Sequence, residues 1–571
     1  MFTTLPMDTS VFIRWGWADL EPFYKDLTAR QLDASNISSW LTDWSNLAAR
    51  VHETYQRLYV GITANTTDPT ATSQYEEFLN EIFPKSQAAD QQLREKLLTS
   101  GLEPQNFSIP LKNMRAKASI YRQVNLPLLS EELKLSADYD QIIGNQTVNW
   151  LGKEITLSRL QMVSYEQSRA LREQAWRVTA ERQLQDRQAI NDLWMKLMDV
   201  RGQLAANAGL PNYRAYRWQQ LLRFDYTPED CKRFHQAIEK VVVPAASRNY
   251  EKRRQQLGVI TLRPWDLKVN PSGLSPLRPF DGIDELEDKT ATIFHQVDPQ
   301  LGDYFDIMRR ENLLDLENRK DKAPGGYCTE FLVVRRPFIF MNAVGIQEDV
   351  QTLLHEGGHA FHVFEAANLP YIQQVEVGME FGEVASMGME LLASPYLTES
   401  NGGFYSVKDA ARARVEFLED ALLYWPYMAV VDAFQHWVYE NHSLARIPAN
   451  CDKTWSELWD RYMPGVDWTG LDDARVTGWQ RKLHIIQVPF YYIEYGLAQL
   501  GAIQLWRNAV EDQRQAVANY RRALSLGGTV PVPDLYATAG IKFAFDEETL
   551  GEVVELMETK IDELVSVYQA D

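Results

Sequence analysis

The chain has 571 residues, of which 58 are Lys or Arg and 78 are Asp or Glu, giving a formal net charge of −20 at pH 7. Because the chain is this acidic and has no concentrated basic run, we expect no nucleic-acid partner. An apolar content of 45% and a charged content of 24% are typical of a soluble globular protein. This length predicts a large core and more than one structural unit.

The cysteines and the N-terminus indicate the compartment. Cys231, Cys328 and Cys451 are far apart, and any pairing would leave one of them over. We therefore expect reduced thiols in a cytoplasmic protein. The first residues lack the charged and apolar regions of a signal peptide, and no apolar stretch is long enough to span a membrane, so no membrane partner is expected. The oligomeric state is not predicted.

The first third of the chain has the spacing of amphipathic helices. Apolar residues recur every three or four positions from Ile37 to Leu58, which predicts a helix there. From about residue 160 to residue 208, the same spacing predicts one very long helix or two helices in line. The turn-forming segment 209–213 ends this pattern.

The clearest interruption of the helical pattern is the proline-rich stretch 257–282. Within it, residues 259–262 predict a strand, and the loop that follows is interpreted as a crossing between lobes. Beyond residue 370 the pattern is helical almost to the end of the chain. The sequence therefore predicts a mainly α fold with a small β-sheet.

A metal-binding motif, His355-Glu-Gly-Gly-His359, lies in the second half of the chain. An apolar run with strand character, residues 337–342, precedes it, and apolar residues at helical spacing surround it between positions 346 and 364. Positions i and i+4 of an α-helix share one side, about 6 Å apart along the axis, so both imidazoles can bind one zinc ion. Glu356 then lies beside the open coordination position as a general base. The alternative is a helix with two surface or core histidines.

The motif contains two consecutive glycines, Gly357 and Gly358. Inside a helix each glycine costs about 1 kcal/mol relative to alanine. We therefore expect something to approach the backbone of this helix closely, either a neighbouring helix or a ligand.

A catalytic zinc ion needs a third protein ligand. His362 lies about 10 Å along the helix axis from His355, too far for one ion to reach both. We interpret it as a core histidine or one that supports the ligands. Glu383, 24 residues after His359 in the next predicted helix (residues 381–392), is the better candidate.

Three polar residues share one face of this next helix: Glu383, Ser386 and Glu390. Buried carboxylates need a charged partner, which a zinc ion supplies. Glu390 is then predicted to orient a ligand histidine. Glu376 and Glu380 are close enough in sequence to be rival ligands, and the alternative for both is a solvated helix face. The same ligands can also bind cobalt or manganese.

These motifs resemble the M3 family of zinc oligopeptidases, most closely its oligoendopeptidase F branch. The resemblance covers about residues 320–545. It rests on the segments 349–362 and 382–386, on the loop 323–328, and on His484 with the tyrosine-rich segment 489–495. The glycine-histidine-glycine loop of the thimet oligopeptidase branch is not visible, so that branch's substrate contacts are not transferred.

The resemblance implies a fold of two helical lobes, arranged like a clam, with zinc deep in a channel between them. Residues 1–200 would form the N-terminal lobe or lid, and residues 201–571 the catalytic domain. Such a channel admits short unfolded peptides and excludes folded proteins. The implied activity is therefore hydrolysis of internal peptide bonds in short peptides.

The chemistry and the resemblance assign roles to the site residues. Zinc lowers the pKa of a bound water, and Glu356 takes its proton and later passes it to the departing amine. The resemblance assigns stabilisation of the oxyanion to His484 and Tyr495, and substrate contacts to Tyr491 and Tyr492. It does not decide which of the three tyrosines acts on the oxyanion. The alternative for this cluster is ordinary aromatic core packing.

The apolar strand before the motif has two interpretations. Residues 338–341 are expected to form an edge strand that pairs with an extended peptide substrate, reading its backbone. Burial of the same residues in the core explains their apolar character equally well.

Two other functions are compatible with the sequence. A helical zinc carboxypeptidase would need a cation for the substrate's C-terminus, and Arg335 or Arg336 could provide it. A helical binding protein would hold a structural metal or none. The presence of Glu356 argues against the binding protein, because a structural site has no use for a general base.

Overall fold

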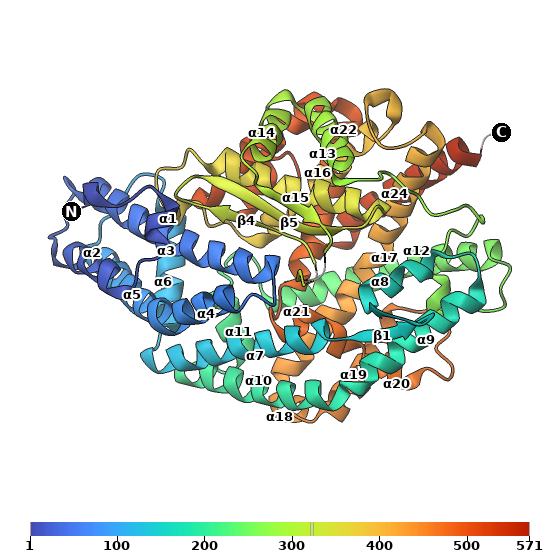
Figure 1. Cartoon of the computed structure of the whole chain (residues 1–571), viewed down its shortest axis with the longest axis horizontal. Coiled ribbons are helices and arrows are strands. Elements are labelled where there is room, and N and C mark those ends of the chain that lie inside the picture. The colour runs from blue at the N-terminus through green and yellow to red at the C-terminus, as the bar shows by residue number, and fades with distance from the viewer. Residues whose placement is uncertain (1, 320, 324, 570–571) are drawn as a thin grey trace.

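The computed structural model describes residues 2–319, 321–323 and 325–569. It is mainly helical with small sheets, as the sequence predicts (Figure 1). At the N-terminal end, drawn in blue, α1 (Thr9–Phe12) is followed by helices that share one core: α2 (Trp17–Ala29), α3 (Ile37–Ala64), α4 (Pro69–Glu77), α5 (Phe83–Ser100) and α6 (Ser108–Ile120). The helix predicted from Ile37 is confirmed as α3, whose Trp40, Leu41 and Trp44 are buried. In the described residues no helix is long and apolar enough to cross a membrane.

The next segment contains α7 (Leu126–Gly144), β1 (Thr147–Trp150), β2 (Lys153–Thr156), α8 (Leu157–Gln161), α9 (Arg169–Gln185), α10 (Arg187–Asn207) and α11 (Tyr213–Gln220). The predicted long helix is two helices, α9 and α10, which meet at Asp186. The Asp186 carboxylate accepts hydrogen bonds from Arg182 and Gln146 at this junction. Because α10 crosses residue 200 without a break, the proposed lobe boundary there stays a prediction.

Two large cores occupy the rest of the molecule. The helices are α12 (Pro228–Gln256), α13 (Ile283–Val297), α14 (Pro299–Arg310), α15 (Gln347–Ala366), α16 (Met379–Ala393), α17 (Val407–Glu440), α18 (His442–Ala445), α19 (Pro448–Tyr462), α20 (Asp472–Val476), α21 (Leu483–Ile486), α22 (Tyr492–Leu524), α23 (Val532–Thr538) and α24 (Glu547–Gln569). One core lies among α10, α12, α17 and α24, and the other among α13 to α16. Helix α22 contributes buried residues to both cores and thereby joins them.

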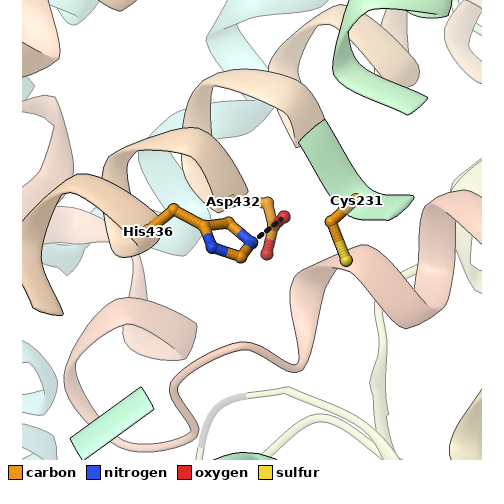
Figure 2. Close-up of side chains that lie close together, drawn as sticks. All are labelled: Cys231, Asp432 and His436. Carbon is orange, nitrogen blue, oxygen red and sulfur yellow. Dashed lines mark ion pairs between the residues drawn. The ribbon is translucent and has the colours of Figure 1, made fainter. Parts of the chain in front are cut away.

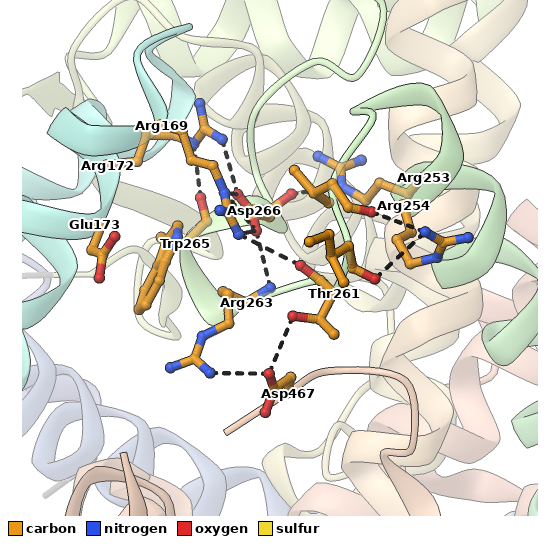
Figure 3. Close-up of polar contacts among 12 residues, drawn as sticks. Arg169, Arg172, Glu173, Arg253, Arg254, Thr261, Arg263, Trp265, Asp266 and Asp467 are labelled. Atoms are coloured by element: carbon orange, nitrogen blue, oxygen red, sulfur yellow. Dashed lines mark hydrogen bonds and ion pairs between the residues drawn. The ribbon is translucent and has the colours of Figure 1, made fainter. Parts of the chain in front are cut away.

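The strand predicted at residues 259–262 is wrong, because this segment forms no strand. Side chains hold it instead of a ladder of backbone hydrogen bonds (Figure 3). The buried Asp266 carboxylate accepts hydrogen bonds from Arg169 and Arg172 of α9, at 2.8 and 3.0 Å, and from the backbone N–H of Arg263. Asp467 in turn binds the Arg263 guanidinium at 3.1 Å. These five side chains thus fasten the proline-rich segment to α9 and to the loop before α20.

The small sheet has the order β3-β5-β4, formed by β3 (Leu314–Glu317), β5 (Arg336–Ala343) and β4 (Tyr327–Phe331). Strand β5 pairs in parallel with β3 and antiparallel with β4. The expectation that residues 338–341 form an edge strand is therefore wrong, since β5 is the central strand. Its side chains Ile339, Phe340 and Met341 are buried, which agrees with the core-burial interpretation. The β4 edge faces α3, where Thr63 and Tyr327 share a 2.6 Å hydrogen bond.

Helices α15 and α16 pack unusually closely. A Cβ atom added to Gly358 would lie 2.3 Å from the carbonyl oxygen of Ala385 and 2.6 Å from the Cα of Ser386. A Cβ atom on Gly357 would lie 2.5 Å from the ring of Phe294. The predicted close approach to the two glycines is confirmed, and the neighbours are α16 and α13. The sheet lies beside α15, with β4 and β5 next to it (Figure 1).

We predict that Asp266→Ala lowers the free energy of unfolding by about 3–5 kcal/mol, because it leaves the buried Arg172 without its counter-ion. Burial raises the pKa of Asp266, but hydrogen bonds from Arg169 and the Arg263 backbone bring the pKa below its usual value. The difference in free energy of unfolding between the native protein and the variant should therefore be present at neutral pH and shrink as acid protonates Asp266. Urea unfolding followed by circular dichroism measures both effects. Asp562→Ala, at an exposed position paired with Lys252 at 3.7 Å, is the control and should change stability by less than about 0.5 kcal/mol.

We also predict that Gly358→Ala destabilises the fold by about 1–3 kcal/mol, because the new methyl group would push α15 away from the α16 backbone. The same displacement should lower the affinity of the predicted His355–His359 site for zinc, which a competition titration with a chromogenic chelator measures. Gly551→Ala in α24 is the matched control, since a Cβ atom there meets nothing within 4 Å. A Gly358→Ala protein as stable as the native one would contradict this packing.

Candidate active site

Three side chains from two helices converge on one point. His355 and His359 lie on α15, and Glu383 lies on α16. The Nε2 atoms of both histidines are 3.4 Å from the Oε2 atom of Glu383. Glu383 is buried, whereas 23% of the His355 side chain and 20% of the His359 side chain are exposed. The group is therefore closed on the α16 side and open to solvent on the other.

These residues fit a bound metal ion. Ligand atoms at about 2.0–2.1 Å from a tetrahedral zinc ion lie about 3.3 Å from one another, close to the spacing seen here. The buried Glu383 carboxylate also requires a positive partner. Two imidazole nitrogens and one carboxylate oxygen form a donor set that suits zinc and that cobalt and manganese also accept.

Each of two candidate ligands is held by further hydrogen bonds. The His355 Nδ1 atom lies 2.7 Å from the Glu390 carboxylate, as expected for a residue that orients a ligand. Because an ionised carboxylate only accepts, this bond places a proton on Nδ1 and leaves Nε2 as the ring nitrogen that faces Glu383. The Glu383 carboxylate accepts hydrogen bonds from Ser386 Oγ at 2.9 Å and from the Tyr491 hydroxyl at 2.6 Å. The sequence did not predict this contact of Tyr491.

The carboxyl group of Glu356 has an oxygen atom that is available to accept a proton. It is buried beside the two histidines, and its Oε2 atom has no hydrogen-bond partner among the described residues. Burial raises the pKa of Glu356, because the charged form loses its hydration. A carboxyl group in this position can both accept a proton and give it back.

An aromatic cluster lies next to the candidate ligands and contacts Glu383 through Tyr491. The ring centroid of His484 lies 6.0, 5.0 and 5.6 Å from those of Tyr491, Tyr492 and Tyr495. The structure distinguishes the three tyrosines: Tyr491 donates to Glu383, Tyr492 is buried and bonded to the Tyr424 hydroxyl, and Tyr495 is half-buried. In the described part of the chain, the Tyr495 hydroxyl has no hydrogen-bond partner. Burial lowers the pKa of His484 to about 3, so its ring is neutral.

A turn with a strained backbone, at Phe490, positions this aromatic cluster. Phe490 has a left-handed backbone (φ 66°), a conformation that side chains with Cβ rarely adopt. Its N–H donates to Gln435 Oε1 at 2.5 Å, and its carbonyl accepts from Arg223 at 2.5 Å. Arg223 also binds Glu494 at 2.6 Å. These supporting residues carried no recognisable signal in the sequence, because their role depends on a backbone conformation.

The rival glutamates lie elsewhere. Glu376 pairs at the surface with Lys117 at 2.6 Å, in agreement with a solvated face. Glu380 is buried, so the solvated-face alternative is wrong for it. It accepts a 2.5 Å hydrogen bond from the Tyr226 hydroxyl and lies 3.6 Å from Arg223.

Other candidates from the sequence also lie outside the converging group. His362 is buried with its ring edge-on to Phe381, and no hydrogen bond joins it to the candidate ligands in the described residues. Burial lowers the pKa of His362 to about 4. Arg336 is bound to Glu311 at 2.7 Å, and Arg335 donates to the carbonyl of Ala367. Both arginines thus already bind groups of the protein itself. In the loop 323–328, residue 324 lies outside the described residues.

A second group of ligand-type side chains is buried elsewhere: Cys231 on α12 with Asp432 and His436 on α17 (Figure 2). Arg214 lies 3.1 Å from the His436 Nδ1 atom, and a guanidinium can only donate. The ring proton of a neutral His436 is then on Nε2, facing Asp432 at 3.2 Å. A protonated nitrogen cannot bind a metal, so we interpret this group as a buried polar network.

Comparison with known proteins agrees with this geometry. Two curated relatives are oligoendopeptidase F homologs, from Borreliella burgdorferi (21% identical over 354 residues, 60% of this chain and 57% of that protein) and Mycoplasma pneumoniae (23% identical over 297 residues, 49% and 46%). The match thus spans less than two thirds of either relative's length.

Solved structures share the fold over almost the whole chain. Pz peptidase A with an inhibitor has a TM-score of 0.91, 27% identity and 99% of each chain covered. A provisionally assigned oligoendopeptidase F has a TM-score of 0.90, 28% identity and 98% of each chain covered. The family model described as peptidase family M3 matches residues 162–554, which is more than half of the sequence. The chain therefore belongs to peptidase family M3.

Proposed function

We propose that the protein is a zinc-dependent oligoendopeptidase that hydrolyses internal bonds of short, unfolded peptides. The observation that carries this proposal is the convergence of His355, His359 and Glu383 beside the unpartnered carboxyl group of Glu356. The family supports a peptidase, and the names of the curated relatives support the oligoendopeptidase type.

In the proposed reaction, a zinc ion held by these three ligands would polarise the scissile carbonyl and make a water molecule more acidic. Glu356 accepts a proton from the attacking water and passes it to the departing amine. In this proposal the Tyr495 hydroxyl and the neutral His484 ring donate hydrogen bonds to the oxyanion. Tyr491 holds Glu383 through its hydrogen bond, and Tyr492 supports the cluster through its bond to Tyr424.

We further propose that the N-terminal helices, within residues 1–200, limit access to the site. Helix α3 covers the sheet that lies beside α15: Glu53 accepts a 2.7 Å hydrogen bond from the N–H of Val333, and Thr63 is bonded to Tyr327. We therefore propose that a substrate passes these helices on its way to the site. Such an arrangement favours short flexible peptides over folded proteins.

Glu356→Gln should abolish peptide hydrolysis while leaving zinc binding intact, because the amide keeps the shape of the side chain but cannot accept the proton. General base catalysis contributes about 10²–10⁴-fold, so kcat should fall by at least that range. Mass-spectrometric mapping of cleavage products from a mixed peptide library measures this, with zinc content determined in parallel. Chelation should stop cleavage by the native enzyme, and added zinc should restore it.

Glu376→Gln, at the surface glutamate paired with Lys117, is the matched control and should cleave normally. Metal-dependent cleavage that persists in the Glu356→Gln variant would contradict the assigned base. Stepwise loss of single C-terminal residues would instead indicate a carboxypeptidase.

Tyr495→Phe should lower kcat by about 10²–10³-fold with little change in KM, as expected for loss of one oxyanion donor. Tyr492→Phe removes a hydroxyl bonded to Tyr424 and should leave kcat nearly unchanged. Tyr491→Phe removes the hydrogen bond to Glu383 and should weaken zinc binding by about 10–100-fold. Steady-state kinetics and zinc competition on all three variants distinguish these roles. Equal losses of kcat in Tyr492→Phe and Tyr495→Phe would refute the assignment.

A further inference from the structure

Lys482 is an unpaired cation close to the candidate active site. It lies two residues before His484, at the start of α21. In the described residues no carboxylate lies within 4.0 Å of its ammonium group and no hydrogen bond engages it, although the chain has a net charge of −20. By contrast, the two cations that we considered from the sequence for a substrate carboxylate both have partners within the protein. Arg335 donates to the carbonyl of Ala367, and Arg336 is paired with Glu311.

Aromatic rings fix the position of this ammonium group. The Nζ atom lies 4.4 Å from the ring centroid of Tyr492 and 5.3 Å from that of Tyr427. The Tyr492 ring is in turn 5.0 Å from the His484 ring. These separations place the ammonium within roughly 9 Å of the His484 ring, the span of about three extended residues. The rings attract the cation, but they do not neutralise its charge.

Lys482 and its neighbours remain accessible. Lys482, Tyr427, His484 and Tyr495 are all half-buried, so each keeps part of its surface open to solvent. Burial lowers the pKa of Lys482 to about 8, because no nearby carboxylate compensates the charge. The amine is therefore still protonated near neutral pH. A partly desolvated ammonium with no counter-ion is a favourable partner for an anionic group of a ligand.

We propose that Lys482 binds the C-terminal carboxylate of the peptide substrate. This inference rests on the proposed peptidase function and adds a specificity determinant to the same site. A peptide whose carboxylate is bound at Lys482 places a bond within a few residues of its C-terminus between Glu356 and the aromatic cluster of His484. The enzyme then cuts short peptides at a fixed distance from a free C-terminus.

The test compares two forms of one short peptide, with a free C-terminal carboxylate and with a C-terminal amide, at neutral pH. Hydrogen bonds to charged groups predict that the native enzyme favours the free acid by about tenfold or more in kcat/KM. In Lys482→Met, which keeps the length of the side chain, the ratio should fall to about one, through loss on the acid peptide alone. Lys482→Arg should retain part of the preference. Lys453→Met, at an exposed lysine of α19, should retain all of it.

The outcomes are distinct. Equal cleavage of acid and amide by the native enzyme would overturn the proposal, and so would a preference that persists in Lys482→Met. A lysine that acted only by keeping His484 neutral would change kcat for both peptides and leave their ratio intact, which also overturns it. The native acid-to-amide comparison needs no variant, so a poorly folding mutant cannot hide the answer. Absence of any metal-dependent cleavage would instead refute the proposed peptidase function.

Discussion

The contact between α15 and α16 is the constraint on which the candidate site depends. HExxH spacing brings His355 and His359 to one side of α15, but the third candidate ligand comes from another helix. Gly358 allows the α16 backbone to approach until Glu383 lies 3.4 Å from both imidazoles. The carbonyl of Ala385 at this crossing also accepts a 2.6 Å hydrogen bond from Tyr520 of α22. The glycine that weakens the isolated helix thereby sets the geometry of the candidate metal site.

Buried charges connect α16 to the aromatic cluster of His484 and the tyrosines. Arg223 lies between Glu380 of α16 and Glu494 of α22, and it also holds the carbonyl of the strained residue Phe490. Buried ion pairs seldom add net stability, but removing one partner is costly, so they fix relative positions firmly. The left-handed turn at Phe490 is retained because several contacts hold its backbone at once and together outweigh its strain. Its effect is to direct the Tyr491 hydroxyl onto Glu383.

The sequence predicted what depends on local periodicity. The helices around residues 37–58, 346–364 and 381–392 follow from apolar spacing, and Glu390 was predicted to orient a histidine from its position on the helix face. Predictions failed where distant side chains decide the structure. Residues 259–262 have strand-like composition, but Asp266 and its arginines hold that segment. The central position of β5 depends on pairing with β3, and the separate contacts of the three tyrosines depend on the turn at Phe490, which spacing cannot show.

The charges around the site are ordered by distance from the candidate metal ligands. Carboxylates lie closest, and Glu356, Glu383 and Glu390 are all buried. The next groups, His484 and the tyrosines, are neutral hydrogen-bond donors, so in the proposed reaction they would approach an oxyanion without competing with a metal for the carboxylates. A cation in that position would pair with Glu383 or Glu356 and remove the ligand or the base. The Tyr492 ring separates Lys482 from His484. At that distance the proposed attraction of a substrate anion by its positive charge leaves the carboxylates free.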